Sequence, residues 1–380
     1  MSKAEPASAS TNPRSQPRSV IVVGAGLVGL GCAWRLGLRG HQVQLIDAGT
    51  SPDQPNGSQA ALGVLMARVF HRSSGCSWRL RQHSLDLWSS WRQELAARDL
   101  PIAWRQGLLL LAANAADQER QRLLISDPRR QSLGLELWDR SRLESLSPDL
   151  PSGALGGLHS RNDGQLDPGQ ALEAIGKDAA RLGITPLHGI ATAVEKRGAG
   201  WRVSLKGGGH CEAAWVVLAA GLGLAELLAS LGQELALEPV LGQALELERH
   251  DAAAPASAAG WSWPGVIHWQ GANLIPRPDL PGGQCFWLGA TLEPGQRADA
   301  STLEALRSLN GTAPAWLQQA RERRRWQGLR PRPIARPAPV LEAIAPGVLL
   351  ASGHYRNGVL LTPATAAWVV EQIEANTTYA

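Results

Sequence analysis

The chain has 380 residues, 44% of them apolar, and a formal net charge of +4 at neutral pH. This length permits two or three domains with a sizeable core, and so small an excess of positive charge does not favour nucleic acid as a partner. The four cysteines (Cys32, Cys76, Cys211 and Cys285) form neither a C-x-x-C pair nor a zinc spacing. We therefore expect a reduced, cytoplasmic protein with no metal site.

Residues 1–18 are rich in Ser, Pro and Ala. They lack the apolar run of a secretory signal or of a membrane span. We expect a disordered tail and no membrane association, with a plant-type transit peptide as the alternative.

Residues 19–47 predict a strand, a glycine turn, a helix and a second strand in direct succession. The apolar strand is followed at once by Gly24-Ala25-Gly26-Leu27-Val28-Gly29, which has the pattern G-x-G-x-x-G, and the second strand stops at Asp47. In this pattern the first glycine turns the chain, the second admits a pyrophosphate and the third lets the helix pack on the sheet. The unit predicts a dinucleotide site in which Asp47 accepts hydrogen bonds from ribose hydroxyls. A glycine-rich turn without a ligand is the alternative.

The rest of the chain predicts alternating helical and antiparallel pieces. Apolar periodicity and capping residues predict helices over residues 78–97, 114–124, 168–182, 301–309, 314–324 and 362–373, and a helix start within 58–65. Strands are predicted over 107–112, 135–138, 153–160, 190–195, 201–205, 214–220, 243–248, 266–269, 273–276 and 285–290, and loops over 251–259, 328–331 and 353–358. We expect an α/β fold (α+β overall) with two discontinuous domains.

Two further features bear on a ligand. The strand over 214–220 stops at Ala220-Gly221, as expected where a backbone approaches a cofactor. Trp88 and Trp91 lie on the apolar side of the helix over 78–97, so we expect core residues there and not cofactor-stacking ones.

Short pieces that follow one another along the chain after residue 19 match a known family in number and order. Besides the glycine turn they are Ala60-Ala61-Leu62-Gly63, Leu166-Asp167-Pro168, Val217-Leu218-Ala219-Ala220-Gly221, Pro239-Val240-Leu241-Gly242-Gln243, Ile275-Pro276-Arg277, Gly289-Ala290-Thr291, Gly328-Leu329-Arg330-Pro331 and the run from Gly353 to Pro363. The sequence resembles the FAD-dependent amine oxidases of the D-amino-acid oxidase superfamily and, within it, the glycine oxidases of thiamine biosynthesis.

The resemblance implies a Rossmann-type FAD-binding domain (residues 19–102, 165–236 and 327–380) and a mostly antiparallel substrate domain (103–164 and 237–326). It places the pyrophosphate on Leu27 and Val28 and the adenosine ribose at Asp47 and Ala48, with an adenine contact near Ala191. The flavin ring would lie beside Ser58, Ala60, Ala61, Leu62, Gly63 and Val64 and under Gly353, His354, Tyr355, Arg356, Asn357, Gly358, Val359 and Leu360. Related sarcosine oxidases tether flavin through a cysteine near the C-terminus, but no cysteine follows Cys285, so non-covalent FAD is expected.

For the substrate, the resemblance implies that Arg330 clamps a carboxylate, because a guanidinium is a planar, bidentate and permanently charged partner. Arg356 matches a second substrate-binding arginine, while Asn273 and Leu292 stand where relatives carry a tyrosine and a methionine in the pocket. The alternative is that Arg330 and Arg356 are ordinary surface arginines, as Arg321, Arg323, Arg324 and Arg325 at a solvated helix end are expected to be. We expect His354 to act through its backbone and not its imidazole.

The implied reaction is hydride transfer from the substrate Cα to flavin, giving an imine, glyoxylate and ammonia, with oxygen reduced to hydrogen peroxide. Orientation of the substrate would suffice, without a catalytic triad or a metal. Other substrates stay open: a D-amino acid, sarcosine or another secondary amine. A dehydrogenase and a non-catalytic FAD-binding module are further alternatives. The family also implies a role in thiamine synthesis, with thiazole synthase as a partner, and leaves a homo-oligomer open.

Overall fold

The computed structural model describes residues 16–49, 57–249 and 261–375, so the predicted tail up to residue 15 and the predicted loop 251–259 lie outside the described residues. One sheet has six strands, in the order β18 (Val340–Ala345), β19 (Val348–Ser352), β11 (Trp215–Leu218), β1 (Ser19–Val23), β2 (Gln42–Asp47) and β7 (Pro186–His188). All neighbours are parallel except β18, which is antiparallel to β19. This is the doubly wound sheet that the glycine turn predicts.

Both faces of this sheet are covered, because successive side chains of its central strand point to opposite sides. Val20 and Val22 belong to a core formed with α1 (Leu27–Leu38), α2 (Cys76–Ala96), α5 (Pro168–Arg181) and α9 (Gly358–Ala375). Ile21 and Val23 belong to a second core on the other face. Its cover is α6 (Ala225–Ala229) and a three-stranded antiparallel sheet of β8 (Ala191–Arg197), β9 (Gly200–Leu205) and β10 (His210–Ala213).

The larger sheet is mixed and mostly antiparallel. Its order is β16 (Glu293–Pro294), β12 (Leu237–Glu248), β15 (Cys285–Gly289), β14 (Ala272–Arg277), β13 (Val266–Trp269), β4 (Trp104–Ala112), β6 (Gly156–Leu166) and β3 (Val64–Leu65). In addition β17 (Arg321–Pro333) pairs with β12, and β5 (Leu135–Asp139) pairs with β6.

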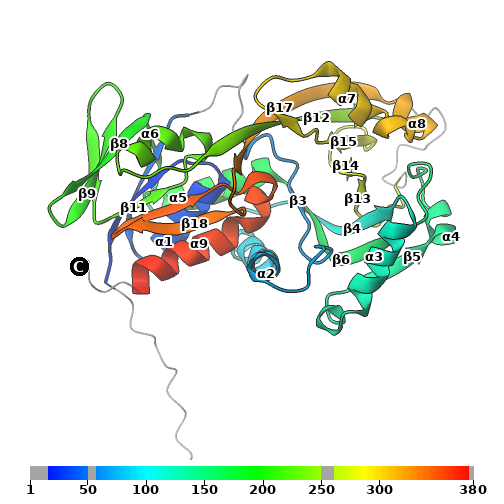
Figure 1. Ribbon diagram of the computed structural model, residues 1–380, viewed down its shortest axis with the longest axis horizontal. Coiled ribbons are helices and arrows are strands. Elements are labelled where there is room, and N and C mark those ends of the chain that lie inside the picture. Colours follow the sequence, from blue (N-terminus) through cyan, green and yellow to red (C-terminus); the bar gives the residue numbers. More distant parts are fainter. Residues whose placement is uncertain (1–15, 50–56, 250–260, 376–380) are drawn as a thin grey trace, which may run out of the picture.

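The two faces of the large sheet differ in what covers them. One face packs against α4 (Arg140–Glu144), α7 (Ala300–Arg307) and α8 (Ala315–Gln318), while α3 (Ala115–Ser126) lies beside β4 and β5. The other face carries Val266, Ile275 and Trp287 and packs against Leu62. This second face therefore looks toward Leu62 and the predicted flavin loop around it. In Figure 1 the long strands β12 and β17 span both halves of the molecule.

The predicted domain boundaries at 164/165 and 326/327 fall inside β6 and β17. These two strands therefore continue from one predicted unit into the other. The division into two discontinuous domains at those residues stays a prediction.

Three sequence predictions around β17 and β3 are wrong. The helix predicted over 314–324 ends at Gln318, and residues 328–331 are strand, not loop, because β17 pairs with β12 along its whole length. Arg321, Arg323, Arg324 and Arg325 are exposed side chains of this strand, not of a helix end. Residues 58–65 form a turn and β3 where a helix start was predicted.

The last helix begins at Gly358, four residues before the predicted start, and contains Pro363. Proline has no N–H to donate to the carbonyl four residues back, which is that of Val359. Trp88 of α2 supplies the missing donor, because its Nε1 lies 2.8 Å from Val359 O. Ser84 Oγ donates to Leu360 O at 2.6 Å and accepts from Ala364 N at 3.1 Å. Trp88 is buried, as predicted.

Candidate active site

The glycine turn between β1 and α1 is as tight as the sequence pattern predicts. Gly24 has a φ of +106°, and a Cβ there would lie 2.6 Å from Ala219 O; a Cβ on Gly29 would lie 1.9 Å from Gly24 O. No other residue type fits these positions without moving the backbone. The N–H of Leu27, in the first turn of α1, donates to Ser58 Oγ at 3.0 Å. This N–H is one that the helix itself leaves unpaired, and Ser58 occupies it; the next N–H groups of the same turn can bind a phosphate oxygen.

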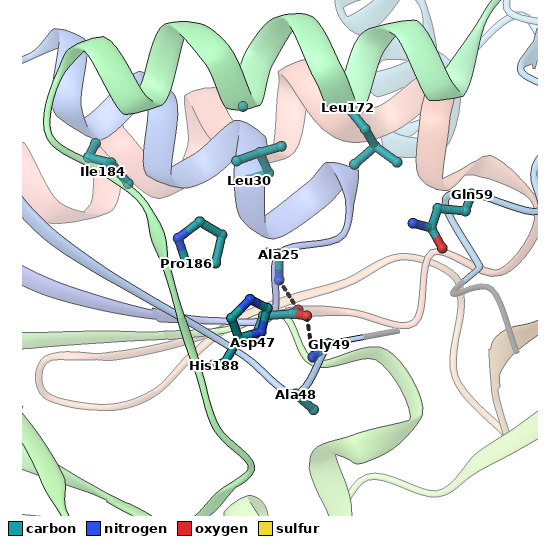
Figure 2. Close-up of a pocket in the computed structure, with 11 residues that line it drawn as sticks. Ala25, Leu30, Asp47, Ala48, Gly49, Gln59, Leu172, Ile184, Pro186 and His188 are labelled. Atoms are coloured by element: carbon teal, nitrogen blue, oxygen red, sulfur yellow. Dashed lines mark hydrogen bonds between the residues drawn. The ribbon is translucent and has the colours of Figure 1, made fainter. Parts of the chain in front are cut away.

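Asp47 closes the same turn from the end of β2. Its carboxylate accepts from Ala25 N at 2.6 Å and from Gly49 N at 2.8 Å, as Figure 2 shows. The carboxylate borders a cavity of about 650 Å³ lined by Ala25, Leu30, Asp47, Ala48, Gly49, Gln59, Leu172, Gly176, Ile184, Pro186 and His188. Leu30 and Leu172 form its apolar side and Asp47 and His188 its polar side (Figure 2). Such a cavity suits a nucleoside, whose flat base packs on apolar side chains and whose ribose hydroxyls need polar partners.

Two further predicted cofactor contacts lie near this turn. Ala191 is the first residue of β8 and pairs with Leu205; the cavity wall is formed instead by its neighbours Pro186 and His188. Ala220 follows β11, and Gly221 turns the chain with a φ of +59°. The adenine contact near Ala191 stays a prediction.

The predicted flavin loop is held by side chains from other strands. Trp326 Nε1 of β17 donates to Ala60 O at 3.0 Å, and Gln165 Nε2 of β6 donates to Leu62 O at 2.9 Å. Gly63 has a φ of +74°, and a Cβ there would lie 1.9 Å from Leu166 O. Backbone groups at residues 60–63 are therefore fixed in position before any ligand binds.

The start of α9 faces this loop and is equally fixed. His354 is buried, its Nε2 lies 2.9 Å from Thr365 Oγ1, and burial lowers the pKa of its imidazole to about 4. Its imidazole is therefore neutral and turned into the protein, and the role of its backbone stays a prediction. Asn357 Oδ1 accepts from Arg81 Nη1 at 2.6 Å, and the Arg81 guanidinium stacks over Phe70.

Arg330 lies on β17 opposite β12. Its Nη1 donates to two carbonyls, Leu241 O and Thr291 O, each at 3.2 Å. Within the described part of the chain its Nη2 and Nε have no hydrogen-bond partner, and no carboxylate forms an ion pair with it. Burial, together with the positive charge of Arg356, lowers the pKa of the guanidinium to about 10, so it stays charged at neutral pH. One edge of a half-buried, charged fork is thus available for an anion.

The other predicted substrate residues lie around Arg330 with different exposures. Arg356 is exposed at the surface of the 3₁₀ turn Tyr355–Asn357, yet its charge lowers the pKa values of Arg330, Arg81 and His268. Asn273 is buried, and its amide is bonded to His268 and to Gly289 O. Leu292 is 42% exposed. The structure thus brings Arg330, Arg356 and Asn273 toward one face of the large sheet.

Sequence reasoning missed the residues that hold Arg330. A Cβ on Gly242 would lie 2.1 Å from Arg330 Nη2, so the guanidinium rests directly on the glycine backbone. Thr291, whose carbonyl binds Arg330, is tied by its hydroxyl to Gln243 N and to the buried carboxylate of Glu293. Gly242 belongs to the family-like run Pro239-Val240-Leu241-Gly242-Gln243. A glycine inside a strand often marks a place where another group approaches the backbone closely. Glu293 carries no comparable sequence signal.

The chain was compared with known proteins. The family model for FAD dependent oxidoreductase (DAO) matches residues 19–372. The chain belongs to this family. A glycine oxidase of Bacillus licheniformis is 26% identical over 371 residues, which are 94% of this chain and 93% of the relative. A bifunctional ThiO/ThiG protein of Nostoc is 27% identical over 94% of this chain, which spans 52% of that protein. The crystal structure of glycine oxidase from Geobacillus kaustophilus matches with a TM-score of 0.82 and 25% identity, covering 95% of this chain and 96% of that one.

As a member of the DAO family the chain is an FAD-dependent oxidoreductase, and its residues suit that cofactor. The cavity beside Asp47 has the size and polarity for the adenosine half, and the N-terminus of α1 offers an N–H to the pyrophosphate. The fixed backbone at residues 60–63 and the start of α9 would hold the flavin half. Among the described residues no helix is long and apolar enough to cross a bilayer, and no cluster of three or more His, Cys, Asp or Glu side chains could hold a metal.

Proposed function

We propose that the protein oxidises glycine or another small amino acid at the Cα–N bond. The observation that supports this most directly is Arg330, a half-buried guanidinium with two of its donors on backbone carbonyls and its remaining edge unpaired among the described residues. A free carboxylate is the group such a fork binds best, because both oxygens can accept at once. An amino acid brings that carboxylate together with the amine that is oxidised.

FAD, when bound, supplies the acceptor for the hydride that leaves the substrate Cα. Arg330 holds the carboxylate and thereby fixes the distance and orientation of the Cα, which is the main contribution that a protein makes to such a reaction. The N-terminus of α9 begins at Gly358, within the segment predicted to lie over the flavin, and the positive end of a helix dipole favours negative charge. Ile275 of the large sheet and Leu62 of the predicted flavin loop, which pack together, exclude water. The products would be an imine, then glyoxylate and ammonia, with oxygen reduced to hydrogen peroxide.

A role in thiamine synthesis is supported by the relatives named bifunctional protein ThiO/ThiG, which join two functions in one chain. We propose thiazole synthase as the partner that uses the imine, and the cytoplasm as the site of the reaction. A D-amino acid, sarcosine or another secondary amine is the second candidate substrate, because Asn273 and Leu292 differ from the tyrosine and methionine expected at these positions.

An anaerobic titration of the purified, FAD-loaded protein with glycine tests the proposal. Glycine should bleach the flavin absorbance band, and peroxide should appear once air is admitted. A flavin that glycine, sarcosine and D-alanine all fail to reduce would refute the proposal. Reduction without peroxide on admission of air would indicate a dehydrogenase in place of an oxidase.

A further inference from the structure

Two polar side chains, His268 and Asn273, stand on the face of the large sheet that otherwise carries apolar residues. They are directly opposite each other on the antiparallel pair β13 and β14. Their strand neighbours Ile267, Trp269 and Leu274 point to the other face, into the core under α7 and α8. His268 and Asn273 therefore share the face of Val266 and Ile275, which packs against Leu62 of the predicted flavin loop.

The hydrogen bonds of Asn273 determine which imidazole nitrogen of His268 carries the proton. The Asn273 amide nitrogen lies 3.2 Å from Gly289 O and must be the donor there, since a carbonyl oxygen can only accept. The opposite edge of the amide, Oδ1, then faces His268 Nδ1 at 2.9 Å as an acceptor. His268 Nδ1 is therefore protonated. In a neutral imidazole Nε2 then has a lone pair and can only accept.

His268 is neutral for a physical reason. Burial, and secondarily the positive charge of Arg356, lower the pKa of its imidazole, while the hydrogen bond to Asn273 raises it. Among the described residues His268 Nε2 has no hydrogen-bond partner. It is also not one of the fully buried polar atoms that lack a partner, so solvent can reach it. A solvent-accessible lone pair with no protein donor is free to accept a hydrogen bond from a donor on a ligand.

The segment Gly289–Thr291 links this pair to Arg330. Gly289 O accepts from Asn273, and Thr291 O accepts from Arg330. The charge of Arg356 lowers the pKa values of both His268 and Arg330, so both groups lie within electrostatic range of that guanidinium. The Asn273–His268 pair and the Arg330 fork therefore border one region and offer it an acceptor and a cation.

We propose, on the basis of the amine-oxidising function above, that His268 binds the substrate amine: Nε2 accepts a hydrogen bond from its N–H while Arg330 holds its carboxylate. Asn273 is the positioning residue that keeps the acceptor nitrogen turned to the ligand. The substrate class follows from this chemistry. The neutral amine must still carry an N–H when it reacts, so primary and secondary amines are accepted and tertiary amines such as N,N-dimethylglycine are rejected.

The test uses the FAD-loaded protein and two variants, His268→Leu and His268→Gln. Flavin absorbance gives both the dissociation constant of acetate, which has the carboxylate but no amine, and the rate of anaerobic reduction by glycine, sarcosine and N,N-dimethylglycine. We expect His268→Leu to bind acetate within about twofold of wild type but to be reduced by glycine about 10- to 100-fold more slowly at subsaturating concentration. In His268→Leu the ratio of the reduction rate with sarcosine to that with N,N-dimethylglycine should fall. His268→Gln keeps a hydrogen-bond acceptor and should recover part of the rate with glycine. His83→Gln, at an exposed position of α2, is the matched control.

Equal losses for acetate and glycine would mean that His268 only shapes the pocket, and the proposal would fall. An unchanged glycine rate in His268→Leu would have the same consequence. If sarcosine or D-alanine reduces the wild type and glycine does not, the substrate named above is wrong, but the role of His268 is tested in the same way with the reactive amine. If none of these amines reduces the wild type, the proposed function fails and this inference fails with it.

Discussion

Replacing Gly242 by alanine should impair substrate binding while leaving the fold intact. A Cβ at this position would lie 2.1 Å from Arg330 Nη2, whereas ordinary contact begins at 3.4 Å, so the guanidinium must move by at least about 1.3 Å. The atoms in conflict are the far end of a flexible side chain, so the cost in stability should be small. A displacement of about 1 Å at a positioning group can cost about 10²-fold in rate. We therefore expect Gly242→Ala to lose about 10²-fold in kcat/KM for the amino acid substrate.

The assay is steady-state peroxide production alongside FAD content and thermal unfolding. FAD content and the midpoint of unfolding should stay close to those of wild type, and the dissociation constant of acetate should rise in parallel with the loss of kcat/KM. Gly169→Ala is a matched control, because the nearest atom to its Cβ would be Asp167 Oδ1 at 3.4 Å. A Gly242→Ala variant with wild-type kcat/KM would show that the position of this guanidinium does not control catalysis.

Three further predictions concern the carboxylate clamp, the nucleotide cavity and a buried histidine. Arg330→Ala should retain FAD and lose about 10³-fold in kcat/KM, since two charge-assisted hydrogen bonds of about 1.5–3 kcal/mol each are removed; unchanged kinetics would remove Arg330 from the site. Asp47→Asn should raise the dissociation constant of FAD about tenfold, measured by flavin fluorescence, with normal activity at saturating FAD; an unchanged FAD affinity would contradict the ribose contact. Burial lowers the pKa of His354 to about 4 in the folded state, below the value of about 6.5 in an unfolded chain. The free energy of unfolding should therefore be at its full value above pH 6.5 and fall by about 3 kcal/mol as the pH drops toward 4, because the unfolded chain binds the proton more tightly. Urea unfolding between pH 7 and pH 4 should show this fall in the free energy of unfolding for wild type and a smaller fall for His354→Gln. An equal fall in both proteins would refute the prediction.

Local signals in the sequence predicted the elements whose ends are set by nearby residues. The glycine turn, the cap of α3 by Asn114 and the cap of α5 by Asp167 are all present, and each depends on atoms within a few residues of one another. Strand β17 was missed because its partner β12 lies about 90 residues away along the chain, as the pairing of Val240 with Arg330 illustrates. Pairing at such a distance leaves no local trace.

The candidate site likewise contains residues with a local sequence signal and residues whose role depends on a distant strand. Arg330 was predicted from its motif and lies at a half-buried position with an unpaired edge among the described residues. His268, Thr291 and Glu293 were not predicted, because each acquires its role through a side chain or carbonyl on another strand. Their functions depend on strand register, which short sequence motifs do not encode.

The contacts that α2 makes around Pro363 have a consequence for how the enzyme assembles. The opening turns of α9 cannot complete their own hydrogen bonds, so they depend on the Trp88 indole and the Ser84 hydroxyl, which come from a helix more than 270 residues earlier in the chain. A helix of this length is marginal on its own in water, so the turns of α9 around Pro363 and the helix α2 must assemble together. Changes at Trp88 or Ser84 therefore act on the start of α9, which is predicted to lie beside the flavin, although both side chains belong to another helix.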